Sequence, residues 1–171
     1  AEGGVANAFV YLRGDLPSTA VPSQAVDIDQ RGCVYRPRVI GARVGQMLRV
    51  HSSDATLHSI RGRSAEGNDF ALSQPSAGLV STVPLTKPEV MLPVRCDVHR
   101  WMRAFIGVVD QEGFAVTDEH GRFALPPVPP GHYTLVAWHE TLGTRELPVD
   151  VVSGGESTAS VTFPAPAAGT Q

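Results

Sequence analysis

The sequence predicts an all-β protein. Glycine and proline recur at short intervals, with 17 Gly and 14 Pro in the chain, and such residues separate strands by turns. Between them, apolar and polar side chains alternate as in half-buried strands, and few stretches have the spacing of an amphipathic helix. With 171 residues and 42% hydrophobic content, the chain has the size of one large β domain or two small ones.

The first part of the chain predicts a series of short strands. In the strand expected at Val90–Cys96, alternation places every second side chain on one face. Cys96 therefore ends this strand with its thiol directed toward the core. The strands expected here are Val5–Leu12, Ala25–Tyr35, Met47–His51, His58–Arg61, Val80–Val83, Val90–Cys96 and Phe105–Val109.

After Asp110 the spacing of strands and turns changes, which indicates a second, smaller β-sandwich module. We expect a first domain at residues 1–110, the second module at 111–163 and a flexible tail at 164–171, where residues are small, polar or proline. Val5–Leu12 could belong to either domain. The strands expected in the second module are Phe114–Thr117, Arg122–Leu125, His132–Trp138, Glu146–Val152 and Ser157–Phe163.

Charge and hydropathy exclude several classes of partner. The formal net charge is −3, and no run of Lys or Arg indicates nucleic acid or an anionic membrane as a partner. No apolar run approaches the roughly 20 residues that span a bilayer. The sequence begins at Ala1 without initiator methionine or signal-peptide core, so we expect a mature periplasmic or secreted protein whose signal peptide has been removed.

The segment with the most chemical information is Cys96-Asp-Val-His99-Arg-Trp-Met102, which is followed directly by an apolar strand. One short loop could present its thiolate, imidazole and thioether to the same ion. Two histidines and a cysteine in a trigonal plane, with a weak axial methionine, are typical of copper electron-transfer sites. His58, at the start of a strand far away in sequence, could supply the second imidazole. Zinc fits less well, because thioether binds it weakly and no second cysteine lies at zinc-site spacing.

These residues resemble the cupredoxins, the family of small blue-copper proteins that includes plastocyanin, pseudoazurin and amicyanin. Cys-x-x-His-x-x-Met has the short spacing typical of amicyanins, and Tyr35-x-Pro37, Gly45 and His58 follow the family order upstream. The resemblance covers residues 30–110. It implies a Greek-key β-sandwich that binds one type 1 copper ion through His58, Cys96, His99 and Met102, with His99 nearest the surface as the electron path.

Two positions depart from the family pattern. Ser59 stands where the family commonly has asparagine after the first ligand histidine, and Ser52 stands where another asparagine is usual. Both hydroxyls could still hydrogen-bond the ligand loop. Such outer contacts orient metal ligands, and Ser59 could change how the thiolate sulfur is stabilised.

In the second module, Val116-Thr-Asp-Glu-His-Gly-Arg-Phe123, continuing through Pro-Pro-Gly131-His-Tyr133, resembles the carboxypeptidase regulatory-like domain. That resemblance covers residues 111–163 and implies a transthyretin-like sandwich. In that family the module is usually non-catalytic, so it implies docking, stability or spacing. Trp138-His139-Glu140 also belongs to this module, and we interpret it as structural packing.

Cys33 leaves an alternative open. A pair of cysteines in a secreted protein commonly forms a disulfide, and a Cys33–Cys96 bond would make the chain a metal-free interaction module. We favour a second interpretation, in which Cys33 is a buried small hydrophobe, as free cysteines often are. His51 and His120 are expected to face water.

The function expected from these features is one-electron transfer outside the cytoplasm, without enzyme activity. A four-ligand site has no open position for a substrate, and the chain lacks the paired His-x-His motifs of multicopper oxidases. Arg100, Trp101 and Arg103 could form a docking surface for a redox partner with an acidic face. The alternative that uses the same ligands is copper trafficking or delivery.

Overall fold

The computed structural model describes residues 3–17 and 19–164 and divides the chain into two compact units. The central unit is Ser18–Glu112, and the terminal unit combines Ala1–Pro17 with Gly113–Gln171. The first strand therefore belongs with the second part of the chain, one of the two assignments left open for Val5–Leu12, and not with the rest of the predicted first domain at 1–110. Of the predicted tail at 164–171, residues 165–171 lie outside the described part of the chain.

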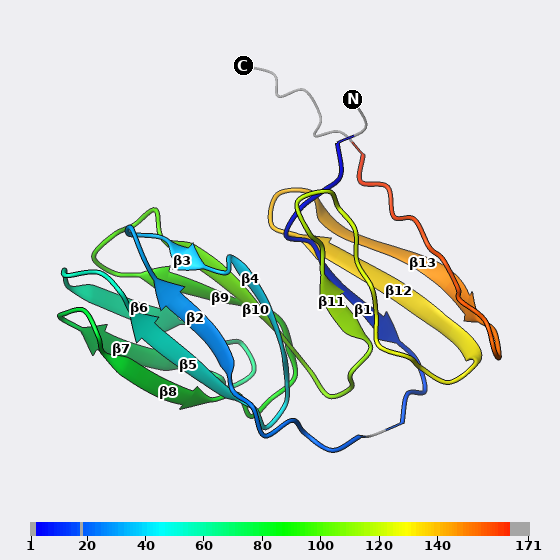
Figure 1. Cartoon of the computed structure of the whole chain (residues 1–171), viewed down its shortest axis with the longest axis horizontal. Coiled ribbons are helices and arrows are strands. Elements are labelled where there is room, and N and C mark those ends of the chain that lie inside the picture. The colour runs from blue at the N-terminus through cyan, green and yellow to red at the C-terminus, as the bar shows by residue number, and fades with distance from the viewer. Residues whose placement is uncertain (1–2, 18, 165–171) are drawn as a thin grey trace. The chain divides into compact units, whose positions relative to one another are not determined.

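The central unit contains two sheets, as an all-β sandwich requires (Figure 1). In the order of hydrogen-bonded neighbours, the five-stranded sheet consists of β4 (Val39–Arg43), β10 (Arg103–Val109), β9 (Glu89–Cys96), β6 (His58–Gly62) and β7 (Phe70–Gln74). The four-stranded sheet consists of β3 (Tyr35–Arg36), β2 (Val26–Gln30), β5 (Met47–Ser52) and β8 (Val80–Pro84).

The core of the central unit draws on both sheets. Leu48 and Val50 of β5 are fully buried with Ile60 of β6, Leu92 of β9 and Ile106 of β10. Along β9 the residues Leu92, Val94 and Cys96 are all buried, as the alternation predicted, whereas Val90, expected on the same face, is exposed. Burial of each such aliphatic side chain contributes about 1.5–3 kcal/mol of transfer free energy. Cys96 therefore lies at the end of a strongly anchored strand.

Strand directions bring three loops to one end of this sandwich. β2 and β5 are parallel, so both end on the same side, and β6 begins there after the 53–57 loop. β6 and β9 are antiparallel, with Ile60 opposite Cys96, which places the end of β9 beside the start of β6. The β2–β3, β5–β6 and β9–β10 loops therefore meet at one edge of the core.

Some central strands differ from the expected ones. The expected strand Ala25–Tyr35 is two strands, β2 and β3, separated by a turn in which Gly32 and Cys33 have positive φ angles of 66° and 52°. β4 and β7 were not predicted. β4 is buried on both faces, so it lacks alternation, and β7 is an edge strand whose four residues before Gln74 are exposed or half-buried.

Gly62 in β6 allows close approach of the Phe70 ring. A Cβ atom at Gly62 would lie 2.3 Å from a ring carbon. We expect Gly62→Ala to displace the ring and to lower the free energy of unfolding by about 1–3 kcal/mol, the usual effect of overpacking. Chemical denaturation measures this change. In a Phe70→Leu background the loss should shrink, and an unchanged loss there would contradict the proposed clash.

The terminal unit contains one four-stranded antiparallel sheet among its described residues. Its order is β11 (Phe114–Val116), β1 (Phe9–Arg13), β12 (Gly131–His139) and β13 (Gly143–Val151). The expected strands Arg122–Leu125 and Ser157–Phe163 are not strands, although Phe123, Leu125, Val161 and Phe163 pack against the core of this sheet. The predicted transthyretin-like sandwich is therefore not confirmed, because irregular segments stand where a second sheet was expected.

Within residues 3–17 and 19–164, no helical segment has the length and hydropathy that a membrane crossing requires.

Candidate metal centre

Three of the predicted ligands meet at the loop-bearing end of the central unit. The Cys96 Sγ atom lies 4.0 Å from His58 Nδ1 and 3.8 Å from His99 Nδ1, and the two Nδ1 atoms are 3.2 Å apart. The point equidistant from these three atoms lies about 2.1 Å from each, within the usual range of metal–nitrogen and metal–sulfur distances of about 2.0–2.3 Å. The three side chains thus fit a single trigonal ion.

The strands position these donors. His58 is the first residue of β6 and is completely buried, and Cys96 is the last residue of β9. The backbone N–H of His99 points to Cys96 Sγ at 3.4 Å, and the N–H of Met102 donates to the His99 carbonyl at 2.9 Å. These bonds close the Cys96–Met102 loop.

Met102 follows this loop and is almost completely buried, at 1% exposure. It belongs to the same core cluster as Cys96, and its carbonyl accepts a hydrogen bond from the Cys96 N–H at 3.4 Å. Its backbone therefore helps to shape the loop. Ligation by its thioether stays a prediction.

Asp54 is a residue of the site that the sequence analysis missed. Its Oδ2 atom lies 3.0 Å from His58 Nε2 and accepts the Cys33 N–H at 2.9 Å, while Oδ1 accepts the Gly32 N–H at 2.7 Å. Burial alone would raise the pKa of Asp54, but the Cys33, Gly32 and His58 hydrogen bonds together hold it below its ordinary value. The carboxylate thus favours a proton on Nε2 and leaves Nδ1 of His58 free to bind metal.

Tyr35 lies on the core side of the site, in one cluster with Cys96. Its hydroxyl is buried near Cys96 and makes no hydrogen bond of ordinary geometry among the described residues. Burial first, and then the Cys96 thiolate, raise the pKa of Tyr35. The group therefore stays a neutral O–H near the sulfur, in surroundings from which the phenolate is excluded.

Cys33 occupies the β2–β3 turn beside the same cluster. It packs against the core, as predicted, but it is only half-buried. Its Sγ atom and one ring nitrogen from each of His58 and His99 all lie within 4.8 Å of one another. Both cysteines are free thiols, which contradicts the interpretation of the chain as a metal-free module with a Cys33–Cys96 disulfide.

The two predicted outer residues behave differently. Ser59 Oγ donates to Asp97 Oδ2 at 3.4 Å, and its carbonyl accepts the Asp97 N–H at 2.8 Å, so Ser59 does contact the ligand loop. Arg61 pairs with the same carboxylate at 2.8 Å, and its hydrogen bond lowers the pKa of Asp97. The buried Ser52 hydroxyl has no hydrogen-bond partner among the described residues. The predicted bond from Ser52 to the ligand loop is therefore absent.

Exposed apolar side chains surround the donors. Trp101 is 64% exposed, yet its ring centre lies 5.3 Å from that of His99 and its Nε1–H donates to the Cys33 carbonyl at 3.0 Å. Trp101 therefore covers one side of His99 and remains available at the surface. Arg100 and Arg103 are also exposed. Leu57 and Val98 are also exposed, and each directly precedes a histidine donor, while the exposed Val34 follows Cys33.

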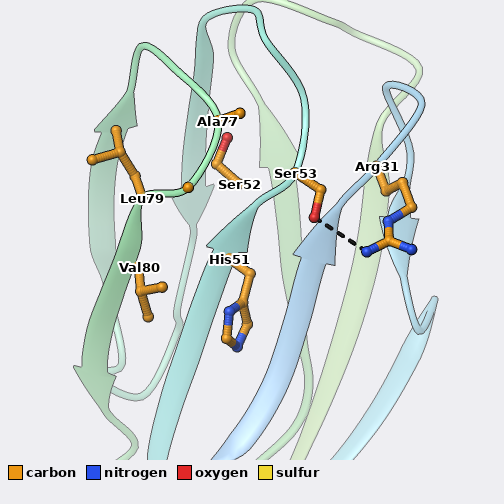
Figure 2. A pocket seen from close by; sticks show the side chains of 8 residues that line it. Arg31, His51, Ser52, Ser53, Ala77, Leu79 and Val80 are labelled. Atoms are coloured by element: carbon orange, nitrogen blue, oxygen red, sulfur yellow. Dashed lines mark hydrogen bonds between the residues drawn. The ribbon is translucent and has the colours of Figure 1, made fainter.

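A pocket of about 540 Å³ lies where β5 ends and β8 begins, lined in part by Ser52, Leu79 and Val80 (Figure 2). His51 borders this pocket, and its Nε2 atom lies 2.6 Å from Asp27 Oδ1. His51 is half-exposed and engaged in this pair, in agreement with its predicted position toward water. None of the four predicted ligands lines the pocket.

The histidines of the terminal unit have structural surroundings. His139 Nδ1 accepts N–H bonds from Thr141 and Leu142, both at 3.3 Å, in the β12–β13 turn. Its ring also lies 6.2 Å from that of Phe163. His139 therefore stabilises a turn, as the interpretation of Trp138-His139-Glu140 expected. His120 is exposed in its loop.

No model of a known protein family matches the sequence, and no curated protein matches it. Among solved structures, the chain is similar to a Cu-containing nitrite reductase (NirK) from Thermus scotoductus SA-01, with TM-score 0.46 and 19% identity over 56% of this chain. The match spans 24% of the nitrite reductase, about a quarter of its length. A mutant of amicyanin in the Cu(I) form gives TM-score 0.44 and 16% identity, with 58% of this chain and 97% of that chain covered.

Proposed function

We propose that this protein binds one copper ion through His58, Cys96 and His99, with Met102 as a weak axial ligand, and carries single electrons between redox partners in the periplasm or outside the cell. The observation that carries the proposal is the trigonal arrangement of one sulfur and two Nδ1 atoms about a point roughly 2.1 Å from each. This donor set is typical of copper electron-transfer sites.

The copper would supply the exchange of one electron between its Cu(I) and Cu(II) states. The protein supplies a fixed coordination geometry, which limits rearrangement of the ligands on electron transfer. His58 and Cys96 are buried at strand ends, and Asp54 fixes the His58 ring. His99 is only half-buried and lies beside the exposed Trp101. Electrons would therefore enter and leave at the His99 edge.

The same edge supplies a surface for a redox partner. Arg100 and Arg103 provide positive charge, and Trp101, Val98 and Leu57 provide exposed apolar area. Aromatic residues and arginine are enriched at interfaces. A partner with acidic residues around an apolar centre would complement this surface, and its association rate would fall with rising ionic strength.

Enzyme activity is not part of this proposal, because the proposed ligands leave no coordination position for a substrate. The one alternative function that a specific observation favours is copper delivery. The additional free thiol of Cys33 near the site would stabilise Cu(I) in a protein that holds and transfers it. Rapid loss of Cu(I) to a chelator, without reversible one-electron reduction, would favour delivery over electron transfer.

Visible spectroscopy tests the proposed site. Adding Cu(II) to the metal-free Cys33→Ala variant should produce an intense thiolate-to-copper band, and adding Cys96→Ser to that variant should abolish the band, because Cys33 and Cys96 are the two cysteines of the sequence. His120→Ala, which removes an exposed histidine of the terminal unit, should leave the band unchanged. A thiolate-to-copper band missing from Cys33→Ala, or one that survives in the Cys33→Ala/Cys96→Ser double variant, would refute the proposed ligand set.

A further inference from the structure

Cys33 is held by the same residues that hold the proposed ligands. The Oδ2 atom of Asp54 binds both the Cys33 N–H and His58 Nε2. The Cys33 carbonyl accepts the Trp101 indole N–H at 3.0 Å, which joins the β2–β3 turn to the loop that carries Cys96 and His99. One carboxylate and one indole therefore fix the Cys33 backbone relative to both histidines.

The backbone of Cys33 is also unusual. Its φ angle is 52°, a left-handed conformation that few residues other than glycine and asparagine adopt. The preceding residue, Gly32, has a φ of 66°, so the turn places two successive residues in this region. Strained backbone at a residue with a chemically active side chain is more common at functional sites than elsewhere. A thiol at this position therefore calls for an explanation beyond packing.

We propose that Cys33 is a second thiolate ligand of the metal centre and takes the fourth position in place of Met102, so that two cysteines and two histidines bind the ion. This inference rests on the proposed metal binding at His58, Cys96 and His99. The distances support it, since Cys33 Sγ lies within 4.8 Å of a ring nitrogen of each histidine. Along the chain, Cys33 stands 63 residues before Cys96, so only folding brings the two thiols to one site.

A second thiolate changes the chemistry of the site. Two imidazoles and two thiolates suit thiolate-preferring ions such as Cu(I), and they also form a common donor set for zinc. Each thiol loses a proton to the solvent when it binds, so metal binding would release two protons rather than one from the thiols. The added negative charge would lower the reduction potential of copper relative to a site with one thiolate.

The test counts thiolate ligands in the full, reduced chain with Co²⁺ as the added metal. Cobalt–thiolate bonds absorb in the near ultraviolet, and proton release is measured independently by titration at constant pH. In Cys33→Ala we expect the absorption per bound Co²⁺ to fall to about half and thiol proton release to fall from two to one. Val34→Ala, a change in the same turn at an exposed residue, should alter neither quantity.

Cys33→Gly separates ligation from packing. Glycine adopts a φ of 52° without strain, so this variant should be at least as stable as the parent in the metal-free state. It should nevertheless lose the same half of the cobalt–thiolate absorption. If Cys33 had a structural role alone, Cys33→Gly would instead be less stable than the parent and would keep the full cobalt–thiolate absorption.

Unchanged absorption and proton release in both Cys33 variants would overturn the proposal. That result would leave the proposed function standing if Cys96→Ser still abolished the copper band. Conversely, two thiolates counted with Co²⁺ but no reversible one-electron reduction with copper would uphold the role of Cys33 and refute electron transfer.

Discussion

Replacing Asp54 by alanine is expected to weaken Cu(I) binding about ten- to a hundredfold, the usual effect of removing a residue that orients a metal-binding histidine. Asp54 Oδ2 holds Nε2 of His58 at 3.0 Å, which leaves Nδ1 directed at Cys96 and His99. Without the carboxylate, the imidazole can exchange its proton between the two nitrogens. The Cys33 and Gly32 N–H groups also lose their acceptor. Competition with a Cu(I) chelator measures the affinity.

Asp29→Ala is a matched control, because it removes the same charge from β2, which pairs with the strand that leads into the loop of Asp54. Asp29 contacts Ser53 and Arg31, neither of which is a proposed ligand, and we expect the affinity to change little. Nitrogen NMR of the His58 ring in the metal-free protein gives a second measurement. The Nε2–H tautomer should dominate in the parent and in Asp29→Ala, and should lose its dominance in Asp54→Ala. Equal affinities and tautomers in all three proteins would contradict the positioning role of Asp54.

The central features of the site could be predicted from the sequence because they are local. Alternation along β9 determines that Cys96 is buried at a strand end, and a three-residue interval places His99 in the same loop. His58 lies far away in sequence, and its position beside Cys96 depends on the antiparallel pairing of β6 and β9. That pairing follows from the fold that the cupredoxin resemblance implied, and the distances agree with it.

Asp54 and Cys33 could not be assigned in the same way. An aspartate four residues before a histidine in a loop carries no pattern that separates an orienting carboxylate from a solvated one. Cys33 was placed on a continuous strand from Ala25 to Tyr35, and the left-handed turn that breaks this strand reverses the local side-chain directions. Only the Gly32-Cys33 pair in the sequence gave a signal, since glycine before a strand residue commonly marks a turn.

The strands of the terminal unit were mispredicted for a different reason. Apolar residues such as Phe123, Leu125, Val161 and Phe163 do pack against the core, so their burial pattern was informative. Burial alone does not specify hydrogen-bonded strand pairing, and these segments cover the sheet without adding strands to it. The first strand, β1, pairs with β11 and β12 across more than 100 residues of chain. Such non-local pairing leaves no trace in local periodicity.

Replacing Ile60 by alanine is expected to lower the free energy of unfolding of the metal-free central unit by about 2–5 kcal/mol. Ile60 is completely buried in the core cluster and lies directly opposite Cys96 in the β6–β9 pair. Truncation leaves a cavity next to the strand ends that carry His58 and Cys96. Hydrogen exchange of the β6 and β9 amides, recorded at increasing denaturant concentration, measures the loss of unfolding free energy in this unit alone.

Metal should offset part of that loss, because an ion that binds only the folded state stabilises it. When the free metal concentration is 100 times the dissociation constant, the free energy of unfolding rises by about 2.7 kcal/mol. Leu135→Ala is the matched control, a similar truncation at a residue buried in the core of the terminal unit. Its loss should be of similar size but insensitive to metal, because the proposed donors all belong to the central unit. If metal stabilised both variants equally, the two units would unfold together. If metal did not stabilise Ile60→Ala, the ion would not be bound where β9 ends and β6 begins.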